Sequence, residues 1–265
     1  MRLQGRITIL AAAAAITMAS CTGSNNDGNY PIRPVPFTSV KMTDHFWAPR
    51  IKKNHEVTIP IAFGYCESTG RIKNFEIAGG LDTGAFQSIY PFDDSDVTKI
   101  IEGASYSLQT FPDPDLEAYL DTLIYKIGLA QEDDGYLYTN RTIAEMGYGK
   151  IHDWAEGERW GKTNILSHEL YNMGHMYEAA VAHYQATGKR DFLDIAIKSA
   201  DLVDKDFGWD AFVSYPGHQV IEMGLVKLYR VTGEKRYLDL AKFFLDARGT
   251  RDDGEEYSQS HMKVV

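Results

Sequence analysis

The chain has 265 residues, of which 44% are hydrophobic and 24% charged, a composition typical of globular proteins of one or two domains. Its formal net charge is -10 at pH 7, and without Arg2 and Arg6 near the start 25 basic side chains stand against 37 acidic ones. Such an excess of negative charge repels phosphate groups, so the composition argues against nucleic acid as a partner.

The first twenty residues are typical of a targeting segment that is not part of the fold. Arg2 and Arg6 precede an apolar run over residues 7–18, which is too short to span a bilayer. An Ala-Ser-Cys sequence that ends at Cys21 follows, and this pattern resembles a bacterial lipoprotein signal, in which Cys21 becomes the lipidated first residue. We therefore expect an exported bacterial lipoprotein, in the outer membrane or periplasm, anchored to the membrane through Cys21. The alternative is an ordinary secretory signal with a coincidental cysteine.

Residues 21–37 are rich in Gly, Asn, Ser and Pro, which predicts a flexible tether before the folded part. Cys66 is the second of two cysteines, so the sequence provides neither a disulfide framework nor a cysteine-based zinc motif. Cys66 lies in an opening helical segment, residues 45–69, and we expect it to be a small buried apolar side chain.

After the tether, apolar residues recur with the period of a helix and predict an all-α fold. An apolar stripe over residues 97–108 and a second one over residues 116–127 predict a first helical hairpin. The second helix has a start signal at Asp113-Pro114, because aspartate favours the N-cap and proline the first turn.

Three carboxylates, Asp93, Asp94 and Asp96, stand immediately before the first stripe. Paired carboxyl groups serve glycoside hydrolysis by protonating the leaving oxygen and by attacking or activating water at the anomeric carbon. Acidic residues are also common at a helix N-terminus, where the helix dipole stabilises negative charge. Both interpretations stay open: capping of the helix, or contact of Asp94 or Asp96 with a substrate.

A long irregular stretch, residues 131–164, interrupts the helical pattern and contains Tyr136, Trp154 and Trp160. Long loops on a rigid scaffold often carry function. Tryptophan and tyrosine present flat apolar faces with polar edges, which suit sugar rings. The alternative is that these aromatic side chains only pack against helix ends.

A helical hairpin then occurs twice, in residues 168–196 and 218–241. A repeat built from two helices indicates stacked or circularised hairpins, and its offset of 45 residues differs from the 34 of tetratricopeptide adaptors. The residues that match at this offset are Tyr184 and Tyr229, Thr187-Gly188 and Thr232-Gly233, and Leu193-Asp194 and Leu238-Asp239.

The helix that follows Gly217 is apolar on two sides, so we expect it to be buried, whereas its partner is apolar on one side only. Inner helices that alternate with outer ones are the arrangement of an (α/α) barrel. The two apolar sides consist of Ile221, Leu225 and Leu228, and of Val220, Met223 and Val226.

Seven short stretches carry a resemblance to a known family: FDDSDVTK (92–99), PDPDLE (112–117), AQEDDGYL (130–137), SHELY (167–171), GH (174–175), EAAV (178–181) and GHQVIE (217–222). In this order and spacing they resemble the N-terminal part of the catalytic domain of glycoside hydrolase family 127, the β-L-arabinofuranosidase group. The resemblance implies an (α/α)6 barrel, incomplete in this chain, and exo-cleavage of β-L-arabinofuranosyl groups from plant-type arabinose-containing glycans. It also implies a zinc-bound cysteine nucleophile for the complete family domain.

By this resemblance, His168 and His218 correspond to two family histidines that hydrogen-bond the terminal arabinose. A neutral imidazole donates from one nitrogen and accepts at the other, which fits paired sugar hydroxyls, although histidines also cap helices or fill cores. His168 and His175 share a helix face, as do His218 and Glu222, but two ligands on a helix are weak support for a metal site. Glu222 is expected to orient His218 or a neighbouring side chain at the substrate. For Glu169 the sequence does not distinguish such an orienting role from a role as a metal ligand.

The resemblance to the family extends to Val265, the last residue of the sequence. In the family, the acid/base glutamate, the nucleophilic cysteine and the glutamate and cysteine ligands of zinc come later, so no cofactor is expected for these residues. We therefore expect residues 38–265 to form a partial catalytic domain that is inactive alone as a glycosidase. A second class remains open, a non-catalytic, glycan-binding helical surface lipoprotein, which would bind sugar as an isolated chain.

Overall fold

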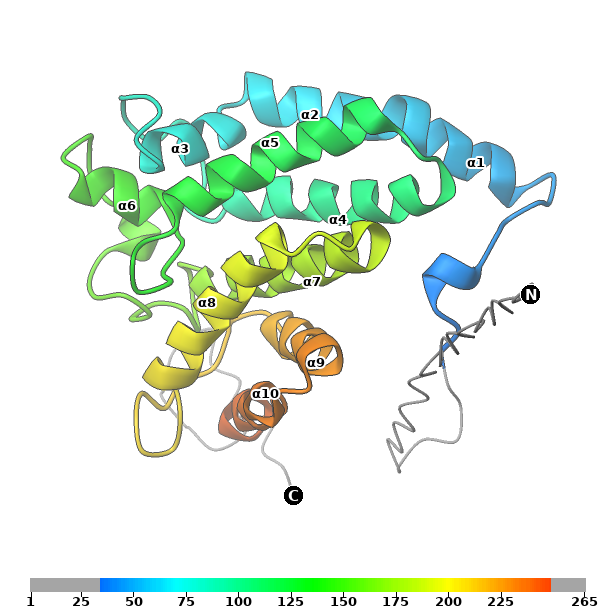
Figure 1. Ribbon diagram of the computed structural model, residues 1–265. Helices are drawn as coiled ribbons and strands as arrows, with labels where there is room; N and C mark the ends of the chain where they lie inside the picture. The colour runs from blue at the N-terminus through cyan, green and yellow to red at the C-terminus, as the bar shows by residue number, and fades with distance from the viewer. Residues whose placement is uncertain (1–33, 249–265) are drawn as a thin grey trace, which may run out of the picture. The chain divides into compact units, whose positions relative to one another are not determined.

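The computed structural model describes residues 34–248, which form α-helices joined by turns and loops (Figure 1). The targeting segment, Cys21 and most of the tether lie outside the described residues, as does the end of the chain from residue 249. Within the described range, backbone pairing of the β type is limited to one bridge between Phe207 and Phe212, so the prediction of an all-α fold is confirmed. The α-helices are α1 (Trp47–Lys53), α2 (Ile59–Ser68), α3 (Arg71–Ala78), α4 (Asp94–Thr110), α5 (Pro114–Ala130), α6 (Thr139–Glu145), α7 (Glu169–Thr187), α8 (Asp191–Asp206), α9 (Ile221–Thr232) and α10 (Lys235–Arg248).

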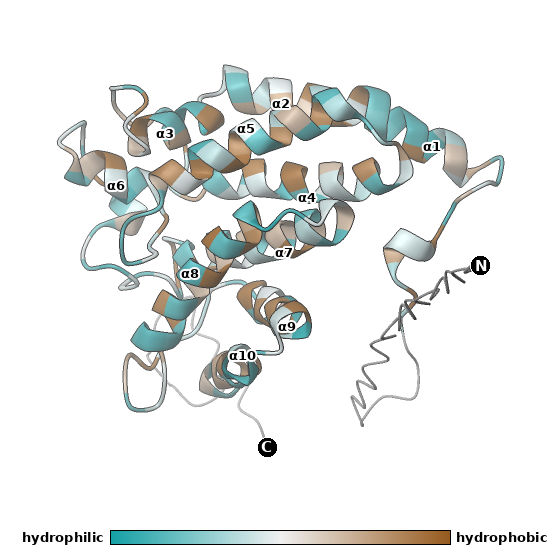
Figure 2. Cartoon of the chain, in the orientation of Figure 1, coloured by the Kyte–Doolittle hydropathy of each residue, from teal (hydrophilic) through white to brown (hydrophobic). Residues whose placement is uncertain are grey.

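Helices α4, α7 and α9 form an inner layer, in which α7 packs extensively against both neighbours. Helices α8 and α10 pack against α7 and α9 from the outer side, and α5 continues this outer layer beside α8 (Figure 1). The inner helix α7 is buried on most of its circumference, whereas α8 buries one face and shows both hydrophilic and hydrophobic residues in Figure 2. The expected alternation of inner and outer helices is therefore present.

Local sequence signals explain where the hairpins begin and turn. The Asp113 carboxylate accepts hydrogen bonds from the backbone amides of Asp115 and Leu116, both at 3.1 Å, and so caps α5 as expected. Gly188 ends α7 and Gly233 ends α9, both in the left-handed conformation with φ of 76° and 79°. In both copies of the repeated hairpin, a glycine in the left-handed conformation thus ends the first helix.

The contact between α7 and α9 depends on two glycines that let the backbones approach closely. A Cβ atom added at Gly174 would lie 2.5 Å from the backbone nitrogen of Ile221, and one added at Gly224 would lie 2.8 Å from the carbonyl oxygen of Gly174. Real Cβ atoms do not approach backbone atoms so closely. The first turn of α9 is consequently held against the N-terminal half of α7.

The expected opening helix is present as α1, a short π-helical segment η2 (Asn54–Thr58) and α2 in direct succession. Cys66 in α2 is buried, as expected, and its burial raises the pKa of the thiol to about 11. None of the helices that the structure describes is both long enough and apolar enough to cross a bilayer.

Two expectations about individual helices are wrong. The helix α9 is not buried on both sides among the described residues, because Met223 is 53% exposed. A Cβ atom at Gly224 would face Gly174 and Tyr177 of α7, and the helical period turns Met223 away from this contact. The stretch 131–164 is also less irregular than its sequence indicates, since it contains α6 and the 3-10 turn η3 (Asp153–Ala155).

Candidate functional site

His168 and His218 lie together where α7 and α9 begin, with 4.8 Å between their ring centroids. His168 is the N-cap residue of α7, and His218 stands two residues before Val220, the N-cap residue of α9. His168 has a φ of 55°, a left-handed conformation that is uncommon outside glycine and occurs preferentially at functional sites. The structure thus brings the two predicted sugar-binding histidines side by side.

Tyr171, on the first turn of α7, lies beside both histidines, at centroid distances of 5.9 Å from His168 and 5.3 Å from His218. Lys99 of α4 donates a hydrogen bond to the phenol oxygen of Tyr171 at 2.6 Å. A phenol oxygen that accepts from an ammonium group keeps its own hydrogen for another acceptor. Tyr171 can therefore act as a third hydrogen-bond donor beside the histidine pair.

Burial keeps the imidazoles of His168 and His175 neutral. It lowers the pKa of His168 to about 4, with His218 as a second, repulsive cause, and it lowers the pKa of His175 to about 4, with Lys99 as the next cause. The Nδ1 atoms of His168 and His175 are buried and have no hydrogen-bond partner among the described residues. Neutral rings with a free nitrogen suit hydroxyl groups, which both donate and accept hydrogen bonds.

These depressed pKa values predict a loss of stability in acid. A histidine whose pKa is lower in the folded state than its ordinary value of 6.5 favours folding fully above that value. As the pH falls from about 6.5 towards 4, the unfolded chain binds more protons than the folded one, so the free energy of unfolding decreases. Urea unfolding at pH 7 and pH 4.5 measures this decrease. His175→Asn removes one titrating ring, so the decrease between the two pH values should be smaller in this variant than in the parent. An equal decrease in the variant and the parent would contradict the lowered pKa of His175.

The three carboxylates at the N-cap and first turn of α4 connect this helix to its neighbours. Asp94 is buried, which raises its pKa to about 7, and it accepts hydrogen bonds from the backbone amide and the hydroxyl of Thr139, at 2.9 Å and 2.5 Å. Arg71 of α3 pairs with Asp93 at 3.1 Å and with Asp96 at 2.7 Å. Asp93 occupies the N-cap position of α4 without a side-chain capping hydrogen bond. Contact of Asp94 or Asp96 with a substrate stays a prediction.

Asp96 is linked to the histidine pair through Lys99. The ammonium group of Lys99 lies 3.6 Å from the Asp96 carboxylate, and it is the same group that donates to the Tyr171 phenol. The first turn of α4 therefore helps to position Tyr171 on α7. Neither Lys99 nor Tyr171 was identified as a site residue from the sequence, although both lie in stretches that carry the family resemblance.

Glu222 lies in the first turn of α9, buried, and its carboxylate accepts a hydrogen bond from Arg248 at 3.2 Å. Burial raises the pKa of Glu222, and the charge of Arg248 opposes this rise. Arg248 also donates to the carbonyl oxygen of Pro216 at 2.9 Å, two residues before His218. Glu222 is thus connected to the segment that carries His218, and its role towards a substrate stays a prediction.

Glu169, which follows His168, anchors the long loop to the start of α7. Its buried carboxylate accepts hydrogen bonds from the hydroxyls of Tyr136 and Ser167, both at 2.6 Å, and from the backbone amide of Trp160 at 3.1 Å. Tyr136 and Trp160 are themselves buried, so for these two aromatic side chains the packing interpretation holds. Glu169 fixes the backbone on both sides of His168.

Trp154 differs from these buried aromatics because 36% of it is exposed. Its ring stacks against Tyr90 at a centroid distance of 5.5 Å and an interplanar angle of 20°, and it lies 6.3 Å from Phe92. Phe92 in turn contacts His168, with 4.6 Å between the ring centroids. A row of rings therefore leads from the histidine pair to the surface.

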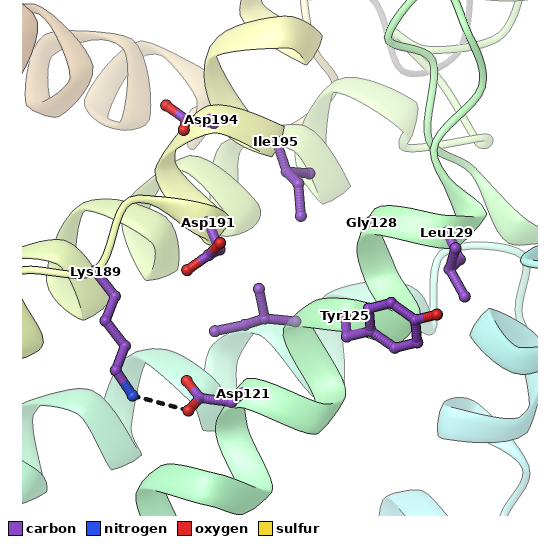
Figure 3. Close-up of a pocket in the computed structure, with 9 residues that line it drawn as sticks. Asp121, Tyr125, Gly128, Leu129, Lys189, Asp191, Asp194 and Ile195 are labelled. Atoms are coloured by element: carbon purple, nitrogen blue, oxygen red, sulfur yellow. Dashed lines mark hydrogen bonds and ion pairs between the residues drawn. The ribbon is translucent and has the colours of Figure 1, made fainter.

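A separate hollow lies between the outer helices α5 and α8 (Figure 3). Its wall includes Tyr125, Leu129 and Ile195, and Lys189 donates to the Asp121 carboxylate at 2.8 Å. The residues that surround the histidine pair do not line this hollow, so it is not part of the candidate site.

The zinc ion that the family resemblance implies has no matching ligand set in residues 34–248. Within this range no group of three or more His, Cys, Asp and Glu side chains is placed to hold a metal ion. The raised pKa of Cys66 also disfavours the thiolate form that binds zinc. No step through a metal is therefore assigned to these residues.

Comparisons with known proteins agree on one family. The family model described as the GH127 catalytic domain of β-L-arabinofuranosidase matches residues 39–265. A curated relative, the non-reducing end β-L-arabinofuranosidase of Bifidobacterium longum subsp. longum, is 36% identical in an alignment 232 positions long that covers 80% of this chain and 34% of the relative.

Two solved structures extend this similarity to the fold. A GH127 β-arabinofuranosidase is 55% identical with a TM-score of 0.79, over 88% of this chain and 36% of that chain. A GH127 β-L-arabinofuranosidase from Geobacillus stearothermophilus T6 is 38% identical with a TM-score of 0.74, over 85% and 35%. The chain spans about a third of the length of these relatives. The helical layers are therefore an incomplete (α/α)6 barrel, as expected.

Proposed function

This chain belongs to the GH127 β-L-arabinofuranosidase catalytic-domain family, and we propose that it supplies the sugar-binding portion of an exo-acting site. The substrate is a glycan that ends in a β-L-arabinofuranosyl group, in keeping with the activity named for the Bifidobacterium relative. The observation that carries this proposal is the contact between His168 and His218 at the starts of two inner helices.

In this proposal the histidine pair holds the terminal arabinose by its hydroxyl groups. The His168 ring, which burial keeps neutral, accepts a hydrogen bond at one nitrogen and donates one from the other. The His218 ring donates a further hydrogen bond, and the Tyr171 hydroxyl adds another donor. Binding of this kind orients the anomeric carbon, which lowers the entropic part of the barrier to hydrolysis. The groups that protonate the leaving oxygen and attack the anomeric carbon are contributed by the remainder of the family domain.

The experiment compares this chain alone with the same chain joined to the C-terminal portion of the Geobacillus relative, with p-nitrophenyl β-L-arabinofuranoside as substrate. We expect no hydrolysis by the chain alone and measurable turnover by the joined protein. His168→Ala combined with His218→Ala should reduce kcat/KM of the joined protein by roughly 10- to 100-fold, the loss of two or three neutral hydrogen bonds.

His45, exposed on the segment before α1, provides the control: His45→Ala should leave kcat/KM unchanged. Turnover by the chain alone, or a histidine double variant as active as the parent, would contradict the proposal. The proposed function predicts weak but measurable binding of arabinofuranosides by the chain alone. The alternative, a non-catalytic, glycan-binding lipoprotein, predicts tight binding by the chain alone and no hydrolysis by the joined protein. Lipidation of Cys21 stays a prediction.

A further inference from the structure

We infer that Tyr90 and Trp154 form a platform for the second sugar ring of the substrate, the ring that carries the terminal arabinofuranosyl group. This inference rests on the function proposed above, because it takes the histidine pair as the place of the terminal ring. In this inference, the two exposed side chains recognise the leaving group.

The position of the platform follows from the row of aromatic rings. Phe92 contacts His168 on one side, and on the other it is nearly parallel to Tyr90, at 5.5 Å and 7°, and to Trp154, at 6.3 Å and 14°. One ring, that of Phe92, thus separates the histidine pair from the two exposed aromatics. Adjoining sugar rings of a glycan are themselves neighbours, so a second ring bound next to the first would lie over Tyr90 and Trp154.

The surface chemistry of the two side chains fits a sugar. Tyr90 is 43% exposed and Trp154 is 36% exposed, so both residues lie at the surface rather than in the core. A flat aromatic face with a polar edge covers the C–H groups of a sugar ring and leaves the hydroxyls free to bond with water. Tyr136 and Trp160, from the same long loop, are buried instead and have structural partners.

The loop that carries Trp154 is held in place before any ligand binds. Arg141 of α6 is buried and donates to the carbonyl oxygens of Ala155, at 2.8 Å, and of Gly157, at 3.0 Å. The backbone amide of His152 donates to the Asn140 side chain at 3.0 Å. A platform fixed in this way loses little conformational entropy when a sugar ring stacks on it.

The test measures binding of two ligands to the chain by ligand-detected NMR titration: methyl β-L-arabinofuranoside, with one ring, and a methyl β-L-arabinofuranosyl disaccharide, with two. Stacking on the platform should make the disaccharide bind roughly 3- to 10-fold more tightly than the single ring. Trp154→Ala or Tyr90→Ala should abolish this preference and leave the affinity for the single ring unchanged. Trp154→Phe keeps a flat ring and should keep most of the preference.

Trp209 provides a matched control, since it is 54% exposed and packs edge-on against Phe243 of the outer helix α10. Trp209→Ala should leave both affinities unchanged, and circular dichroism should show that each variant is folded. A preference that survives both alanine variants would overturn the platform. An equal loss of affinity for both ligands would also overturn it, because that is the result of a structural role. If neither ligand bound the unsubstituted chain, the histidine site itself would be refuted.

Discussion

Replacement of Gly174 by alanine is expected to lower the free energy of unfolding by about 3 kcal/mol, the upper range for insertion of a methyl group into a tightly packed contact. The added Cβ would meet the backbone nitrogen of Ile221 at 2.5 Å and its Cα atom at 2.8 Å. These are backbone atoms, which cannot rotate away as the end of a side chain can. Relief of the clash requires α9 to move away from α7, and this movement would separate His218 from His168.

Urea unfolding followed by circular dichroism measures the change, and binding of methyl β-L-arabinofuranoside measures the separation of the histidines. Gly103→Ala is the matched control, because Gly103 lies within α4 and a Cβ added there meets no atom within 4 Å. Alanine is favoured over glycine inside a helix, so this variant should be as stable as the parent or more stable by about 0.5–1 kcal/mol. Similar unfolding midpoints for the two alanine variants would show that the close contact of α7 and α9 does not contribute to the stability of the fold.

Replacement of Glu169 by alanine is expected to have an effect of similar or larger size, about 3–5 kcal/mol. The substitution removes the shared acceptor of two hydroxyl groups and one backbone amide, all of which stay buried in the folded protein. A buried polar group without a partner costs about 1–3 kcal/mol, and three such groups are left. The loop around Trp160 and the left-handed turn at His168 should both lose their anchor.

Glu169→Gln separates the charge from the shape of the side chain. Glutamine keeps one carbonyl oxygen, which can accept from both the Trp160 amide and the Tyr136 hydroxyl, as one carboxylate oxygen of Glu169 does. The Ser167 hydroxyl, which bonds to the other oxygen, can rotate to accept from the glutamine amide group. We expect a smaller loss, about 1–2 kcal/mol, and retention of part of the affinity for arabinofuranosides. Guanidinium unfolding gives the stabilities. Equal stability of the alanine variant and the parent would refute the role of Glu169 as an anchor.

The hairpins were predictable from the sequence because their signals are local. Apolar residues at helical spacing, the Asp113 cap and the glycines after α7 and α9 act within a few residues of where they stand. Helix α6 was missed for the opposite reason. Its buried residues are mainly polar, among them Thr139 and Arg141, and they are stabilised by tertiary hydrogen bonds rather than by an apolar stripe.

The candidate site was predictable only in part. The histidines stood out through the family resemblance and their place at helix starts, and the structure brings them together. The pairing of Asp94 with Thr139 spans 45 residues, and that of Lys99 with Tyr171 spans 72. Periodicity and caps carry no information about such distant partners, so the roles of Lys99 and Tyr171 required the fold.

The shared direction of the inner helices has an electrostatic consequence. Helices α4, α7 and α9 begin close to one another in space. Phe92, His168 and His218 lie at or just before the starts of these helices, and His168 contacts both of the other rings. The peptide dipoles of an α-helix sum to a partial positive charge at its N-terminus. Dipoles from several helices thus converge on the histidine pair, so the field there favours the electron-rich oxygens of a sugar.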